Sequence, residues 1–134
     1  MNQINKLLLC LLFFSVACGK TSQNKKDDIE ILTKGTQLYS KYGCAVCHSL
    51  DGTVIYGPPL NEIYMKNVKV IRNGKEFTVI ADREYLKKAI TEPRYDKVLE
   101  YKNKEMPLTQ ISEEETDLLV DYIIAIHEKN QTGK

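Results

Sequence analysis

The pentapeptide Cys44-Ala45-Val46-Cys47-His48 decides how the rest of this 134-residue sequence is interpreted. It has the pattern C-x-x-C-H, which is the attachment motif of c-type haem. Two thiols at this spacing reach the two vinyl groups of one porphyrin, and the adjacent imidazole comes under the iron as the proximal ligand. We therefore expect one covalently bound haem c, attached through Cys44 and Cys47, with His48 as an axial ligand of the iron.

Three other interpretations of the two cysteines are a thioredoxin-like dithiol, a zinc site and a structural disulfide. A dithiol of that kind follows a buried strand within a βαβ pattern, whereas the segment before Cys44 is predicted to be helical. A zinc site needs a second pair of ligands, and the remaining candidates, Cys18 and His127, lie toward opposite ends of the chain. The disulfide and the dithiol stay open as alternatives without haem.

A haem that only carries electrons needs a sixth ligand opposite His48, and the candidates are Met65, Met106, His127 and the lysines. We expect Met106, because Pro107 keeps it in extended or loop backbone and a thioether on such a loop is typical of low-spin electron carriers. Met65 is expected to be a packing or surface methionine. His127, in the last turn of the predicted final helix, is expected to be a surface imidazole favoured by the helix dipole.

The proximal histidine also needs a partner for its second ring nitrogen, since such a partner fixes the tautomer and tunes the metal. Residues 57–60 have the sequence GPPL, a rigid turn in which neither proline carries an N–H. We expect the carbonyl of Pro58 to accept a hydrogen bond from Nδ1 of His48.

The N-terminal segment is predicted to be an export signal. Its apolar run, residues 7–17, would span as a helix only roughly half of a ~30 Å bilayer core, so it is typical of a signal peptide and not of a membrane span. Ala17 before Cys18 resembles the lipobox of bacterial lipoproteins, in which the cysteine is lipidated. We expect residues 1–17 to be a lipoprotein signal peptide and residues 18–28 to be the lipidated Cys18 with a flexible tether; an ordinary cleaved signal with a free Cys18 is the alternative.

Composition excludes several classes of protein. The chain has 19 Lys and Arg against 18 Asp and Glu, a formal charge of +1, and so lacks the basic footprint of a nucleic-acid binder. Its apolar fraction of 43% argues against disorder, and its length fits one domain with an appendage. Of its four cysteines, Cys10 would leave with the signal and Cys18 would carry lipid, so the haem motif holds the remaining two.

Apolar periodicity and turn residues predict a mostly α fold with a small β-hairpin insertion. Asn73-Gly74 between two alternating segments is a strong signal for a type I′ turn. The expected elements are a helix over residues 29–43, strands over 68–72 and 75–80, a helix over 82–90 and a final helix after residue 112.

Two features predict how the first and last helices are built. Ser112 with Glu115 three positions later forms a capping box at the start of the final helix. Gly35 in the first helix would allow close backbone approach where the two helices cross.

Together, CAVCH at 44–48, GPPL at 57–60 and MP at 106–107 resemble a monohaem class I cytochrome c. Residues 35–126 are similar in particular to the cytochrome c domain fused to subunit II of some haem-copper oxidases, which shares CHSLDG and S-E-E-E before the last helix. The resemblance implies a cytochrome c-like helical fold over residues 29–134 around one covalent haem, His48 and Met106 as axial ligands, and electron delivery to a terminal oxidase. We expect a free-standing carrier without the oxidase's copper-binding domain, and YKNKE before Met106 is more charged than is usual in the family.

We therefore expect a membrane-anchored electron carrier of a respiratory chain and not an enzyme. It would lie on the extracytoplasmic (periplasmic) face of a bacterial cell envelope, with a haem-copper oxidase and an upstream quinol-oxidising complex as partners and no nucleic acid. Lys102 and Lys104 flank the Met106 loop and would either steer an acidic partner or form a solvated charged loop. The alternatives are a five-coordinate haem enzyme or gas sensor to which Met106 does not bind, or a haem-free dithiol redox module.

Overall fold

The computed structural model describes residues 20–133, so the predicted signal peptide and Cys18 lie outside the described residues. Contacts divide the chain into two units, Met1–Glu30 and Ile31–Lys134. In the described part of the first unit the chain is helical, and side chains 25–30 are exposed. Within residues 20–133, no helix combines the length and the apolar character needed to cross a bilayer.

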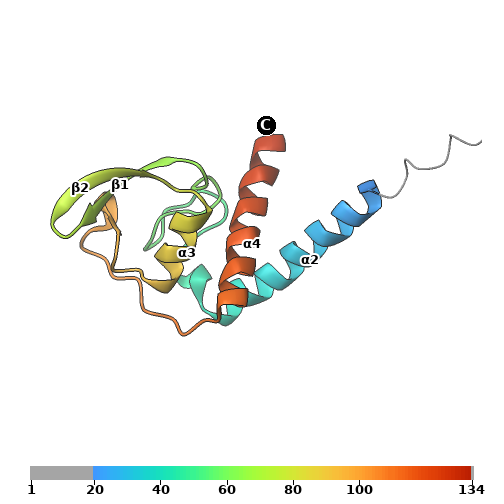
Figure 1. The fold of residues 1–134 in the computed structure, drawn as a ribbon, viewed down its shortest axis with the longest axis horizontal. Coiled ribbons are helices and arrows are strands. Elements are labelled where there is room, and N and C mark those ends of the chain that lie inside the picture. Colours follow the sequence, from blue (N-terminus) through green and yellow to red (C-terminus); the bar gives the residue numbers. More distant parts are fainter. Residues whose placement is uncertain (1–19, 134) are drawn as a thin grey trace, which may run out of the picture. The chain divides into compact units, whose positions relative to one another are not determined.

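The described chain has three α-helices, a small antiparallel sheet and two short 3₁₀ turns (Figure 1). In chain order the elements are α2 (Lys20–Lys41), η1 (Cys44–Val46), β1 (Asn67–Arg72), β2 (Lys75–Ile80), α3 (Arg83–Thr91), β3 (Lys97–Val98), η2 (Leu99–Tyr101) and α4 (Glu113–Thr132). The mostly α architecture with a hairpin insertion is therefore as expected.

Helix α2 begins earlier than the sequence pattern indicates. From Lys20 onward the predicted flexible tether is helical instead. Lys and Gln are good helix formers, and neither Gly nor Pro occurs between Lys20 and Lys34, so no helix-breaking residue interrupts this stretch. At the other end Gly43 has a φ of 68°, a left-handed conformation that turns the chain from the helix into Cys44.

Helices α2 and α4 cross at Gly35, as predicted. A β-carbon at this position would overlap Cβ and Cγ of Tyr122, so only glycine allows the observed approach. One turn farther along α2, the ring of Tyr39 packs on that of Tyr122 with centroids 5.9 Å apart, and both are buried with Leu119. The crossing therefore fixes the helix that leads into the C-x-x-C-H segment.

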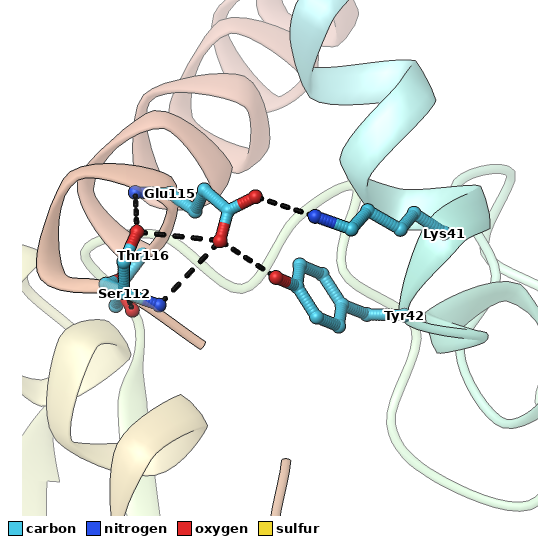
Figure 2. A network of polar contacts seen from close by, with 5 residues as sticks. All are labelled: Lys41, Tyr42, Ser112, Glu115 and Thr116. Atoms are coloured by element: carbon cyan, nitrogen blue, oxygen red, sulfur yellow. Dashed lines mark hydrogen bonds and ion pairs between the residues drawn. The ribbon is translucent and has the colours of Figure 1, made fainter. Parts of the chain in front are cut away.

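Glu115 joins the two helices a second time, at the C-terminus of α2 and the N-terminus of α4 (Figure 2). The predicted capping box with Ser112 is confirmed. The same carboxylate accepts hydrogen bonds from Nζ of Lys41 at 2.7 Å and from the hydroxyl of Tyr42 at 2.6 Å. These two donors lower the pKa of Glu115 to about 2, so the junction just before the C-x-x-C-H segment is held by an ionised carboxylate.

The predicted hairpin is also confirmed. Strands β1 and β2 pair antiparallel with Arg72 opposite Lys75, and Asn73 and Gly74 have φ values of 51° and 75°, as a type I′ turn requires. The two-residue strand β3, which the sequence did not predict, pairs with the other edge of β1, Val98 opposite Val70. Val70, in the central strand β1, is fully buried.

Helix α3 lies between the sheet and α4. It begins at the N-cap Asp82, whose side chain accepts from the backbone N–H of Tyr85 at 2.9 Å. Leu86 of α3 is buried against Val120 and Ile123 of α4. Leu86 and Ala89 of α3 line the two cavities that His48 also lines.

Candidate functional site

A single tight turn presents the two thiols and the imidazole. Within η1 and the residue that follows it, the N–H groups of Cys47 and His48 both donate to the carbonyl of Cys44, at 3.1 and 2.9 Å. Both thiols are free and half-buried. The turn follows the C-terminus of a helix and not a strand, which is the opposite of the order in a thioredoxin-like βαβ site.

The protonation of Cys44 also argues against a redox dithiol. Burial raises the pKa of the Cys44 thiol above its ordinary value. A reactive dithiol needs a cysteine whose pKa is lowered, so that the thiolate forms at neutral pH. The raised pKa of Cys44 therefore does not favour a redox dithiol.

The imidazole of His48 is held by the contact expected from the sequence. Its Nδ1 lies 2.8 Å from the carbonyl oxygen of Pro58. Because a carbonyl only accepts, Nδ1 carries the proton and Nε2 keeps its lone pair for a metal. Burial lowers the pKa of His48, against the opposing effect of the Pro58 carbonyl, so the ring is neutral at neutral pH and able to act as a ligand.

Gly57 has a role that the sequence analysis did not assign to it. A β-carbon there would lie 2.5 Å from Cε1 of His48, so the backbone passes directly against the imidazole. The Gly57 N–H donates to the carbonyl of Cys47 at 2.7 Å, which ties the turn to the C-x-x-C-H segment. The only sequence signal is its place before Pro58.

Tyr39 is a second residue whose contact the sequence did not reveal. Its hydroxyl donates to the backbone carbonyl of His48 at 2.6 Å, and burial raises its pKa, so it remains a donor. Helical periodicity identifies Tyr39 as a core position but gives no target for its hydroxyl.

His48 and Met106 face a common space. Two cavities of about 130 and about 80 Å³ meet there, and five residues line both of them: His48, Leu60, Leu86, Ala89 and Met106. Cys47 lines only the first cavity and Cys44 only the second. A nitrogen ligand and a thioether ligand across an apolar space, with one thiol toward each part of it, fit a haem bound through two thioether bonds.

A larger cavity of about 750 Å³ is lined in part by Pro58 and Pro59. Its lining combines polar and apolar residues of loops and strands and includes no cysteine, histidine or methionine. Of these three cavities, only the two smaller ones are lined by the donor set of a haem site.

Two of the other candidate ligands, Met65 and His127, lie elsewhere. Met65 is 58% exposed and lines neither of the two cavities, as expected of a surface methionine. His127 differs from the expected surface imidazole: α4 continues to Thr132, the ring packs edge-on against Tyr64 at 5.7 Å, and its Nδ1 is buried. His127 lines neither cavity either. Lys97 and Lys104 line the first cavity only, and their ammonium groups are engaged, by Glu105 and by two tyrosine rings. Met106 is therefore the candidate that shares both cavities with His48.

Comparison with known families agrees with this geometry. The family model described as cytochrome c matches residues 32–126, a span that contains the C-x-x-C-H segment, the Pro58 turn and the Met106 loop. No curated protein gives a significant match. Members of the matched family bind haem c covalently and transfer electrons. Because the match covers more than half of the chain, the protein belongs to the cytochrome c family.

Proposed function

We propose that this protein is a membrane-anchored monohaem cytochrome that passes single electrons along a respiratory chain to a terminal haem-copper oxidase. Cys44 and Cys47 would form the thioether bonds to one haem c, and His48 and Met106 would be its axial ligands. One observation carries the proposal: His48 and Met106 line the same two cavities, and each cysteine lines one of them.

When haem is bound, its iron would carry the electron by changing between Fe(II) and Fe(III). The residues around the haem would have separate roles. Pro58 holds the proton on Nδ1 of His48, which leaves Nε2 for the iron. Met106 as a thioether ligand favours the reduced state and raises the potential. Leu60, Leu86 and Ala89 line the space between the two ligands with apolar groups and so exclude water.

The membrane anchor and the cellular location rest on the N-terminal sequence. An export signal followed by Cys18 supports lipid attachment on the extracytoplasmic face of a bacterial envelope, the side on which c-type haem is attached. Several acyl chains, at about 0.8 kcal/mol per buried CH₂, would make this attachment stable.

The proposed partners, a haem-copper oxidase and a quinol-oxidising complex, rest on the resemblance of residues 35–126 to oxidase-fused domains. Exposed apolar side chains near the site, Val46 at 74% and Leu108 at 72%, suit the weak and brief contacts of redox encounters. Lys102 is exposed and able to steer an acidic partner, whereas the ammonium of Lys104 is packed over the rings of Tyr56 and Tyr101 at 5.0 and 5.2 Å.

Two spectroscopic tests decide between an electron carrier and a five-coordinate haem enzyme or gas sensor. The oxidised protein should show the weak near-infrared charge-transfer band of a Met-to-iron bond, and the reduced protein should bind CO slowly because Met106 must first dissociate. Met106→Leu should abolish the band and speed CO binding, while the matched control Met65→Leu should change neither. Absence of the band in the wild-type protein, with rapid CO binding, would contradict the proposal.

A further inference from the structure

Glu105, the residue immediately before Met106, is held from three directions. Its carboxylate lies 2.5 Å from Nζ of Lys97 and 3.8 Å from Nε of Arg94. Its backbone N–H donates to the hydroxyl of Tyr56 at 3.4 Å. Lys97 belongs to β3, Arg94 to the loop after α3, and Tyr56 to the turn before Gly57, so three separate segments converge on one residue.

These contacts matter because the segment around Met106 has no regular secondary structure of its own. Residues 104–112 form neither helix nor strand. Lys104 adds a further link, since its ammonium lies over the rings of Tyr56 and Tyr101. Side-chain contacts, and not a backbone ladder, therefore hold the loop. They also give a physical role to the unusual charge of the YKNKE segment.

We propose that the ion pair between Lys97 and Glu105 is a latch that positions Met106 in the space it shares with His48, and so sets how readily another ligand replaces it. This inference rests on the proposed ligation of the iron by Met106. Lys97 and Glu105 line the larger of the two cavities with Met106, but their charged groups pair with each other. We therefore treat them as positioning residues, which act on the iron through Met106.

The exposure of the pair sets the size of the effect. The side chain of Glu105 is 58% exposed and that of Lys97 is 29% exposed, so solvent screens the attraction. Pairs at such exposure change an equilibrium by about two- to five-fold, which is enough to measure in a ligand titration.

The test is a titration of the oxidised, haem-loaded protein with imidazole, followed by loss of the near-infrared Met-to-iron band. Lys97→Met and Glu105→Gln should each raise the apparent affinity for imidazole about two- to five-fold. The double variant should show no more than either single change, because both remove the same interaction. Lys97→Arg, which keeps the pair, and Lys102→Met, which removes the same charge from the exposed side of the loop, should behave as wild type.

Two results would overturn the latch: wild-type affinity in both single variants, or effects that add in the double variant. If Met106 does not bind the iron, the result is distinguishable from failure of the latch, because the wild-type protein would then lack the near-infrared Met-to-iron band altogether. In that case hydrogen exchange at the amides of residues 104–106 and of Leu108 tests the latch directly. Faster exchange in Lys97→Met than in Lys102→Met supports it, and equal exchange contradicts it.

Discussion

The carbonyl oxygen of Pro58 lies 2.8 Å from Nδ1 of His48, and this contact sets the tautomer of the proposed proximal ligand. The glycine before Pro58 makes the contact possible, since a larger residue would collide with the imidazole. Pro58, on the loop after the C-x-x-C-H segment, thus sets the tautomer of His48 within that segment.

Gly57→Ala should therefore disturb the imidazole directly. The added β-carbon would push the ring away from Pro58, and loss of the hydrogen bond would make the imidazole a weaker electron donor to iron. We expect the reduction potential to rise, together with a loss of about 1–3 kcal/mol in the free energy of unfolding from overpacking. Redox titration and denaturant unfolding measure the two effects. Gly133→Ala, where the nearest atom is at an ordinary 3.5 Å, is the control, and an unchanged potential in Gly57→Ala would refute the coupling.

Gly35→Ala tests the crossing of α2 and α4. The new methyl group would overlap Cβ of Tyr122, which is close to the backbone and has no freedom to swing aside, so the helices must move apart. We expect a loss of about 3 kcal/mol in the free energy of unfolding, at the upper end of overpacking effects. Denaturant unfolding of the haem-loaded protein measures it. A variant as stable as wild type would show that the helices are not in contact there.

Glu115 predicts a specific pH dependence of stability. Its pKa in the folded protein is about 2, below the 4.5 of the free side chain, because Lys41 and Tyr42 donate to the carboxylate. Its contribution is therefore fully present above about pH 4.5 and is lost as the pH falls toward 2. Thermal unfolding of wild type and Glu115→Gln should differ at pH 6 and converge toward pH 2.

The matched control for that change is Glu114→Gln, one position earlier in the exposed first turn of α4. This variant should not reproduce the pH-dependent difference in thermal stability that Glu115→Gln shows between about pH 2 and 4.5. A constant difference between wild type and Glu115→Gln at every pH would mean that the carboxylate is not held in its ionised form.

Cys18→Ala tests the proposed anchor. Without the thiol no lipid can be attached, so the exported protein should move from the membrane fraction to the soluble fraction. Cys10→Ala is the control, because Cys10 would be removed with the signal peptide and the variant should stay in the membrane fraction. Immunoblots of fractionated cells measure the distribution, and membrane retention of Cys18→Ala would contradict lipidation.

The sequence predicts those parts of the molecule that depend on close spacing. The C-x-x-C-H motif, the capping box of Ser112 and Glu115, and the turn at Asn73-Gly74 each need only neighbouring residues to define them. The contact of Pro58 with His48 could also be predicted from the sequence, because a rigid proline turn so soon after the histidine offers few hydrogen-bond acceptors.

Contacts between distant residues were not predictable in this way. The partners of Glu115 on α2, and the pairing of Lys97 with Glu105, depend on how packed helices and strands bring side chains together. β3 has only two residues and is defined by its pairing with β1, so it has no pattern of its own. The extension of α2 to Lys20 was missed because a polar composition was interpreted as a tether although it also favours a helix.

The central claim is that Cys44 and Cys47 hold one haem c with covalent bonds. A pyridine haemochrome spectrum of the purified protein, expressed with the machinery for haem c attachment, tests it most directly. We expect one haem per chain with the spectrum of a porphyrin whose two vinyl groups are both saturated, and no release of haem into acidified organic solvent. A preparation without haem, or with haem that the solvent extracts, would contradict it.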